Sequence, residues 1–444
     1  MTEPAARQRP HDDPRERDIV PPVPVDPATA RSAVVLSGGG AGGAFEIGVL
    51  KALYEGAPPL GGRPLRADVF TGTSVGSYNA AFLAQYDQPA TAAIQDLERV
   101  WRERIAGTLR GCGNGIFRLR LNPFRYLDPG CWRNPLAMLG QTAGDLAFAS
   151  AYGLAYGQQF FTSTDTLEER ALEAVNLGAA VSREPLESLL RDTLDLERLR
   201  RSPNELAVAV SDWQNAKPIV LQKSDIVDRY GTDAILASTA IPGVFAPVCL
   251  DGVTCVDGGL VMNTPFKPAV QAGARVLHVV YTDPYVADIP LAPLPNSAAT
   301  LSRIYAVLVA TQFNGDFRHA AIINEEIAEV AAGAGELAAE ADELPAVRVH
   351  RAIGADRVVG RVLAAGDHRY RPLEIHRYRP TAMGISSVDF LDFSLRVVDR
   401  LIDSGYEQTI RHDCEEAECV IPGMSMTARR GVAPGARPRP GERR

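Results

Sequence analysis

The serine of GTSVG, Ser74, lies in a sequence context that is typical of a catalytic nucleophile. The preceding ADVFTGT has the apolar character of a strand, and the following VGSYNAAFLAQY has the pattern of a helix. A serine between two glycines at a strand-to-helix junction is typical of a nucleophile elbow, because glycines permit the sharp turn that exposes the hydroxyl. We therefore predict that Ser74 is a nucleophile; the alternative is a serine that only caps the helix.

A second glycine-rich turn, SGGGAGG, lies between the strand-like SAVVLS and the helix-like AFEIGVLKALYEG. Backbone N–H groups at the start of a helix bind anions, either a ligand phosphate or the oxyanion of a reaction. Gly38, Gly40 and Gly43 spell the dinucleotide-binding pattern G-x-G-x-x-G, but Asp68 precedes the second strand where the acidic residue of that pattern should follow it. Both turns would open on the same crevice of a parallel sheet, which favours an oxyanion site beside Ser74.

A general base must accept the proton of such a serine. Asp257, in VTCVDGGLVMNTPF, follows a strand-like segment and precedes two glycines that leave its carboxylate uncrowded, although DGG is also a common turn. His278 lies in the apolar run VLHVVY and is interpreted as structural, while His350 and His376 fall in late strand-like segments. No histidine stands in a loop motif that indicates catalysis; the seven are His11, His278, His319, His350, His368, His376 and His412.

Four motifs in chain order carry a family resemblance: SGGGAGGAFEIGVLKAL, GTSVGSYNAA, ASTAIPGVFAPV and DGGLVMNTP. With these motifs the chain resembles the patatin-like phospholipases. The resemblance implies a three-layer α/β/α sandwich. It also implies hydrolysis of acyl esters of phospholipids or other lipids, with no metal or other cofactor.

The resemblance further assigns roles to individual residues. Ser74 would be the nucleophile and Asp257 the general base of a Ser–Asp dyad. The backbone of four glycines would form the oxyanion hole: Gly38, Gly39, Gly40 and Gly43. Gly42 departs from the family pattern, since many members have Arg or Lys there. An ordinary aspartate, with a pKa of about 3.9, is a weak base, so such a dyad needs a site partly shielded from water.

Three other interpretations stay open at this point. An α/β-hydrolase-type esterase would complete a Ser–Asp–His triad with a late histidine, His368 or His376. A dinucleotide-dependent enzyme would use the glycine turn but leaves GTSVG and DGG unexplained. A non-catalytic lipid-binding protein would need neither Ser74 nor Asp257.

The elements that would position these residues alternate between strands and helices. Further strands are predicted at LAVAVSDW, KPIVLQK, VTCVDGG and RVLHVVYTD, with helices at PLESLLRDTL and TDAILASTA and an amphipathic helix in FLDFSLRVVDRLIDSGYEQTIR. The fold class is therefore α/β, with a mostly parallel sheet covered on both faces. We predict one catalytic domain over residues 32–420, in which residues 107–181 form an insertion or cap.

The predicted insertion interleaves aromatic residues with arginines in IFRLRLNPFRYLDPGCW. Arginine beside aromatic side chains suits an anionic lipid surface, so peripheral membrane contact is one interpretation of this segment. The other interpretation, which we favour, is a segment that packs on the protein's own core. The side chains concerned are Phe117, Phe124, Tyr126, Trp132, Arg118, Arg120 and Arg125.

Composition narrows the partners and the location. A net charge of −8 without a basic stripe argues against nucleic acid as a partner. Residues 1–31 and 421–444 are predicted to be disordered tails, the second one basic, and neither a secretion signal nor a membrane-spanning run is visible, which favours a cytoplasmic location. The six cysteines are expected to be reduced thiols, and HDCEEAEC, His412 to Cys419, is interpreted as an acidic, solvated helix end rather than a metal site.

Overall fold

The computed structural model describes residues 30–87, 91–107, 112–162, 180–283, 303, 307, 373–381 and 389–421. The predicted tails therefore lie outside the described residues, apart from residues 30, 31 and 421. His11, His319, His350 and His368 also lie outside them.

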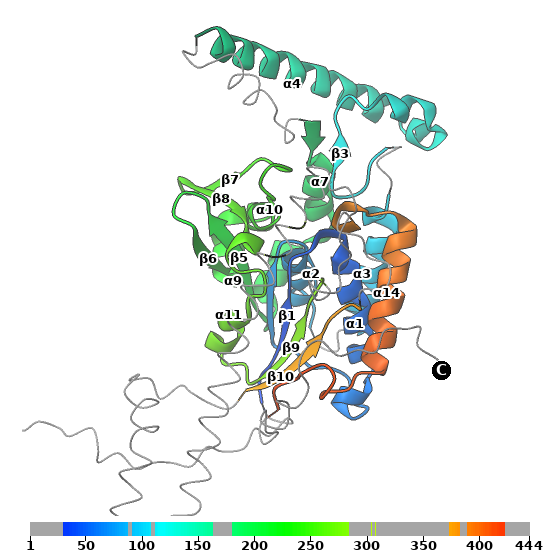
Figure 1. Ribbon diagram of the computed structural model, residues 1–444, viewed down its shortest axis with the longest axis vertical. Helices are drawn as coiled ribbons and strands as arrows, with labels where there is room; N and C mark the ends of the chain where they lie inside the picture. Colours follow the sequence, from blue (N-terminus) through cyan, green and yellow to red (C-terminus); the bar gives the residue numbers. More distant parts are fainter. Residues whose placement is uncertain are drawn as a thin grey trace, which may run out of the picture. The chain divides into compact units, whose positions relative to one another are not determined.

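One mixed sheet of eight strands forms the centre of the fold, in the order β10-β9-β1-β2-β5-β8-β7, with β6 paired to β5 (Figure 1). Parallel pairing joins β10 (Glu374–Tyr378), β9 (Val276–Val280), β1 (Ser32–Leu36), β2 (Val69–Thr73) and β5 (Glu205–Asp212). Antiparallel pairing adds β6 (Lys217–Gln222), β8 (Val253–Asp257) and β7 (Val248–Leu250). The predicted mostly parallel sheet is confirmed.

Helices cover both faces of this sheet, as the sequence predicts. In Figure 1, α11 (Phe266–Gln271) lies on one side of the sheet, and α1 (Gly43–Tyr54), α3 (Thr91–Val100) and α14 (Leu395–Ile410) lie on the other. The backbones of α1 and α14 touch where two glycines face each other. A Cβ on Gly48 would overlap the carbonyl oxygen of Ile402, and one on Gly405 would overlap that of Phe45. Two helices far apart in the sequence are thus packed more closely than larger residues would allow.

The pairing along β5 brings two strand ends together. The first half of β5 pairs with β2, so that Ala209 lies opposite Thr73, and its second half pairs with β8, so that Val210 lies opposite Asp257. The other edge of β5 is occupied by β6. The strands β2 and β8 therefore share one edge of β5 and run toward each other. Their last residues, Thr73 and Asp257, lie opposite consecutive residues of β5.

The predicted insertion leaves and re-enters the fold through a two-stranded ribbon, β3 (Arg118–Leu119) paired with β4 (Val181–Ser182). Between these strands lie two 3-10 helices, η5 (Pro123–Leu127) and η6 (Pro129–Arg133), and the helix α4 (Pro135–Thr162). Two further helices, α7 (Glu184–Thr193) and α8 (Leu196–Arg201), lead from β4 to β5. The role of this insertion as a cap stays a prediction.

The arginines of the insertion bind an internal carboxylate instead of facing outward. Asp145 of α4 is buried and accepts two hydrogen bonds from Arg118, at 2.7 and 2.9 Å, and one from Arg120 at 3.3 Å. A third arginine, Arg125, approaches the same carboxylate at 4.0 Å. These arginine contacts hold the pKa of Asp145 below its ordinary value although burial acts in the opposite direction. These arginines therefore form ion pairs within the insertion, and contact of the insertion with a lipid surface stays a prediction.

The cysteines do not all stay reduced. Cys112 and Cys131 form a disulfide, with Cα atoms 5.3 Å apart. The prediction of six free thiols is wrong for this pair, which the turns around η5 and η6 bring together. Cys249, Cys255, Cys414 and Cys419 are free.

The segment after α14 is not the solvated helix end that the sequence predicts. The helix ends at Ile410, and the chain turns back toward β10, where Val420 and Ile375 exchange backbone hydrogen bonds of 2.8 and 2.9 Å. Cys419 becomes buried in this arrangement. An isolated acidic stretch gives no sign of this return, because the contacts that hold it come from β10.

Candidate active site

Ser74 occupies a sharp turn between β2 and α2 (Val75–Ala84), as the G-x-S-x-G pattern predicts. Its backbone has φ 52° and ψ −127°, a conformation that L-residues rarely adopt and that costs on the order of 1–3 kcal/mol. The glycine positions are explained by space. A Cβ on Gly76 would lie 2.6 Å from the carbonyl oxygen of Leu36, and one on Gly72 would overlap the backbone of Gly76.

The strained turn is held by another serine. The Ser74 N–H donates to the Ser238 hydroxyl at 2.9 Å, and that hydroxyl donates to the Ala209 carbonyl of β5 at 2.7 Å. Ser238 ends the short helix α10 (Asp233–Ser238). It lies in the ASTAIPGVFAPV motif, to which the sequence analysis assigned no role, and its function here is to anchor the elbow.

Asp257 ends β8 and lies beside Ser74, fully buried. Its Oδ1 atom accepts a hydrogen bond of 2.7 Å from the Gly259 N–H, which fixes the carboxylate. Its Oδ2 atom is buried and has no hydrogen-bond partner among the described residues. A buried polar atom without a partner needs an explanation, and an acceptor held ready for the proton of the neighbouring Ser74 hydroxyl is one.

Burial raises the pKa of Asp257 to about 7, against the smaller opposing effects of the Ser74 hydroxyl and the Gly259 N–H. Ser74 is thus near enough to stabilise the carboxylate, yet the two side chains do not form a hydrogen bond of ordinary length and angle. Such bonds often tighten only when substrate is bound. The desolvation that a direct aspartate base requires is present in this structure.

The glycine turn lies against the same serine. A Cβ on Gly38 would be 2.9 Å from the Ser74 Cβ, so only glycine allows this approach. Two of the four predicted oxyanion donors are already engaged: the Gly38 N–H donates to the Asn263 carbonyl at 3.2 Å, and the Gly43 N–H donates to the Gly40 carbonyl. Gly39 is the N-cap and Gly40 the first residue of the 3-10 helix η2 (Gly40–Gly42), so their N–H groups lack an intrahelical acceptor, and no other described residue accepts from them. These two N–H groups are the ones available to an oxyanion.

The DGGLVMNTP motif ties Asp257 to the ends of β1 and β2. The Thr73 hydroxyl donates to the Met262 carbonyl at 2.8 Å, and the Thr71 hydroxyl donates to the Pro265 carbonyl at 2.8 Å. The Asn263 side chain donates in turn to the Gly38 carbonyl at 3.2 Å. The motif therefore fixes the distance between the base and the glycine turn.

Further supports come from residues that the sequence analysis did not single out. Thr282 donates to the Gly38 carbonyl at 2.5 Å and fills the space beside Gly39 and Gly42. Beneath the turn, Asn79 donates to the Gly43 carbonyl at 3.2 Å and to Glu46 at 2.8 Å. Burial raises the pKa of Glu46 well above its ordinary value. No local pattern marks these residues, because each one acts on a distant part of the chain.

The described histidines lie far from Ser74. His278 of β9 and His376 of β10 are aligned with Val34 of β1, which is aligned with Phe70 of β2. Phe70 lies four residues before Ser74, so His376 is displaced by about 13 Å along the strands and by about 14 Å across three strand spacings. Burial lowers the pKa of His278 well below its ordinary value. Neither His278 nor His376 is placed to serve as the base of a triad.

Comparison with known proteins agrees with the motifs. The sequence model of the patatin-like phospholipases matches residues 34–270, which are more than half of the chain and include both turns and Asp257. Among solved structures the chain is similar to VipD from Legionella pneumophila, at 15% sequence identity and a TM-score of 0.32, over 86% of this chain and 66% of that one. The chain thus spans just under two thirds of the length of that protein. On the strength of the family match, this chain belongs to the patatin-like phospholipase family, whose members are lipid acyl hydrolases.

Proposed function

We propose that this protein is a serine acyl hydrolase that cleaves acyl ester bonds of phospholipids or related lipids through Ser74 and Asp257. The observation that carries the proposal is the pairing of a strained serine turn with a buried carboxylate. Ser74 has φ 52°, and Asp257 beside it has a pKa raised to about 7 by burial. Strained residues and shifted pKa values both concentrate at functional sites.

The reaction divides between these groups. Asp257 takes the proton of the Ser74 hydroxyl, and the serine oxygen attacks the ester carbonyl. The N–H groups of Gly39 and Gly40 hold the negative charge that develops on the carbonyl oxygen. Protonated Asp257 then returns its proton to the departing alcohol. In the second half, water loses a proton to Asp257, attacks the acyl-enzyme and releases the fatty acid, after which the proton returns to Ser74.

The oxyanion depends on the backbone alone in this proposal. At Gly42, where many family members have Arg or Lys, a Cβ would lie 2.8 Å from the Cβ of Thr282. Thr282 therefore occupies the space in which a longer side chain would begin. The position that carries a cation in many family members is thus a glycine here, and the adjacent space is filled by Thr282, which donates to the Gly38 carbonyl.

Activity-based labelling tests the proposal. A fluorophosphonate should modify Ser74 and no other serine, as peptide mapping would show. Ser74→Ala should abolish labelling and esterase turnover, while circular dichroism stays unchanged. Labelling that persists in Ser74→Ala would refute the nucleophile, and failure of the folded wild type to label would favour a non-catalytic lipid-binding protein.

A second set of variants separates the dyad from a triad. Asp257→Asn should reduce turnover nearly as much as Ser74→Ala, because the amide has no basicity. His350→Ala and His368→Ala should keep most of the wild-type turnover. If His368→Ala were folded and as inactive as Ser74→Ala, while Asp257→Asn kept its activity, the dyad would be wrong and the triad correct.

The insertion supports a further proposal, that the protein contacts the surface of its lipid substrate there. Eleven of the fifteen exposed large apolar side chains among the described residues lie between residues 119 and 154. Leu127 and Leu136 are the most exposed, at 79% and 80%. An apolar surface of this kind suits insertion between lipid head groups. No helix in the described part of the chain has both the length and the apolar character to cross a bilayer.

A further inference from the structure

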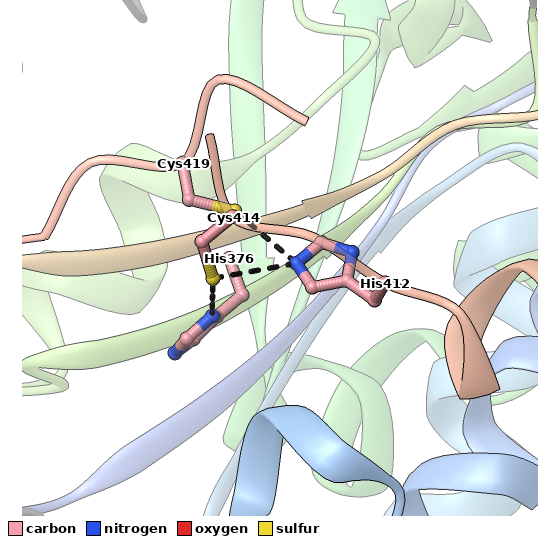
Figure 2. A group of neighbouring side chains, drawn as sticks. All are labelled: His376, His412, Cys414 and Cys419. Atoms are coloured by element: carbon pink, nitrogen blue, oxygen red, sulfur yellow. Dashed lines mark hydrogen bonds between the residues drawn. The ribbon is translucent and has the colours of Figure 1, made fainter. Parts of the chain in front are cut away.

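A cluster of sulfur and imidazole ligands lies at the edge of the sheet, outside the candidate active site. His376 comes from β10, and His412, Cys414 and Cys419 come from the segment that follows α14. Figure 2 shows the four side chains pointing toward one another from these two parts of the chain. One ligand atom from each side chain lies within 4.8 Å of all the others.

Three of the six separations among these ligand atoms match the edges of a tetrahedral metal site. Zinc binds thiolate sulfur at about 2.3 Å and imidazole nitrogen at about 2.0–2.1 Å, which places sulfur and nitrogen about 3.5 Å apart. Cys414 Sγ lies 3.5 Å from His376 Nδ1 and 3.6 Å from His412 Nε2. Cys419 Sγ lies 3.3 Å from His412 Nε2. The other three separations are at most 4.8 Å, so one ion can lie among all four atoms.

The surroundings are those of oriented ligands rather than of mobile surface side chains. His376 is 4% exposed, and its second ring nitrogen, Nε2, lies 2.7 Å from Glu374 Oε1. A carboxylate on the far nitrogen is the usual support of a metal-binding histidine, because it fixes the ring and its tautomer. Cys419 is 2% exposed, and its sulfur accepts a hydrogen bond of 3.3 Å from the Arg377 N–H.

Stacked rings fix the histidines further. The His376 ring stacks on that of His278, with centroids 5.1 Å apart and planes at 8°. The His412 ring packs against that of Tyr378, with centroids 4.8 Å apart. These neighbours limit ring rotation, so the donor atoms of both histidines keep their direction.

We propose that His376, His412, Cys414 and Cys419 bind one zinc ion in a closed, structural His₂Cys₂ site. Four protein ligands complete the tetrahedron and leave no position for water, which distinguishes structural from catalytic zinc. The ion joins the edge strand β10 to the return segment, beside the backbone pairing of Ile375 with Val420. It lies three strands from β2 and takes no part in the ester hydrolysis proposed above.

Another cluster with metal-ligand chemistry, Cys112, Asp128 and Cys131, serves as an internal contrast. Its two sulfurs are bonded to each other, so neither is a thiolate ligand. Cys414 and Cys419 lie only five residues apart in the chain, against 19 for the disulfide pair, yet both are free and face imidazole nitrogens. This difference favours a metal site over a second disulfide.

Metal analysis of the full-length protein tests the proposal. The chain, purified with reductant and without chelator and then equilibrated with zinc and desalted, should hold about one zinc ion by mass spectrometry. Replacement by cobalt should give the intense visible bands of a tetrahedral site and a thiolate-to-cobalt charge-transfer band. Cys414→Ser/Cys419→Ser should lose both signals, and the matched double variant Cys112→Ser/Cys131→Ser should keep them. Equal zinc in both double variants would overturn the assignment.

Alkylation of the wild type covers the case in which a variant fails to fold. Cys414 and Cys419 should resist iodoacetamide until a strong chelator is added, while the exposed thiol of Cys249 reacts throughout. The chelator should also lower the melting temperature by about 5 °C or more. Fully reduced Cys414 and Cys419 that react at once after zinc loading would refute the site. A Cys414–Cys419 disulfide that persists under reducing conditions would refute it as well.

Discussion

Asp257 combines burial and basicity in a single residue. Its carboxylate is completely enclosed, and burial raises its pKa to about 7, close to that of an ordinary histidine. The sequence gives the residue and its turn but not this value, because the enclosure comes from β2, β5 and α10. A pH profile alone therefore does not separate an aspartate base from a histidine base in this protein.

The first prediction concerns the pH dependence of turnover. In the proposed mechanism only ionised Asp257 can take the Ser74 proton, so kcat/KM should fall tenfold per pH unit below a midpoint near pH 7. Steady-state hydrolysis of a soluble short-chain ester between pH 5 and pH 9 measures this limb. A limb with a midpoint near pH 4 would show that Asp257 is not desolvated in solution.

Asp257 should also lower the free energy of unfolding at neutral pH. The folded-state pKa of Asp257 is about 7 and the unfolded value is near 3.8, so the folded protein binds the extra proton between these values. Its stability should therefore decrease as pH rises from about 4 to about 7, by roughly 1.4 kcal/mol per unit of pKa shift. Asp257→Asn removes this titration, so its stability relative to the wild type should increase from pH 5 to pH 8. Urea unfolding of both proteins at pH 5 and pH 8 measures the difference in their free energies of unfolding. The same difference at the two pH values would contradict this prediction.

At the scale of elements, the two turns and their strands follow directly from the sequence. The strand before Ser74, the helix after it and the glycine turn all have local patterns, and the structure confirms each one. Long-range supports such as Ser238 and Thr282 have none, because a single hydroxyl acquires its role only from the strand it meets. The Asp145 cluster shows the same limit, since the pattern shows arginines but not the buried carboxylate that binds them.

Gly40→Ala tests the glycine turn as an element. Gly40 has φ +55°, and a Cβ there would overlap the Phe390 carbonyl oxygen, so the turn must shift and its N–H groups must move. We expect kcat to fall by a factor of about 10²–10³. Gly61→Ala is the matched control, because Gly61 has φ +59° with no atom within 4 Å of the added Cβ. Equal activities in the two variants would exclude the turn from catalysis.

The apolar surface of the insertion is tested by lipid binding. Leu127→Asp/Leu136→Asp places charge at two of its most exposed positions and should weaken co-sedimentation with anionic phospholipid vesicles at least tenfold. Turnover of a soluble ester should stay unchanged, since neither residue lies in the site. Leu395→Asp, at an exposed leucine outside the insertion, is the control. Equal vesicle binding by all three proteins would exclude the insertion as the contact surface.

On the scale of the whole molecule, the sequence predicts the α/β class and the positions of most main strands along the chain, and the structure confirms both. It does not predict how β8 enters the sheet, because β2 and β8 pair with successive halves of the same edge of β5, and local sequence patterns do not specify this pairing. The disulfide and the cluster of His376, His412, Cys414 and Cys419 depend in the same way on turns that bring separate parts of the chain together. Patterns of hydrophobicity record which face is buried, and they do not record which partner is met.

The residues that pack behind the glycine turn limit how short an active fragment of this protein can be. The family match ends at residue 270, but the glycine turn packs against Thr282 and the backbone of Phe390, both beyond that boundary. A gene fragment cut at residue 270 would also lose β9 and α14, leaving one edge of β1 and one side of α1 uncovered. Such a fragment should contain every proposed catalytic group and yet neither fold stably nor react with a fluorophosphonate. Expression of residues 30–270 beside residues 30–421, with labelling measured on the soluble fraction, checks this expectation; an active short fragment would contradict it.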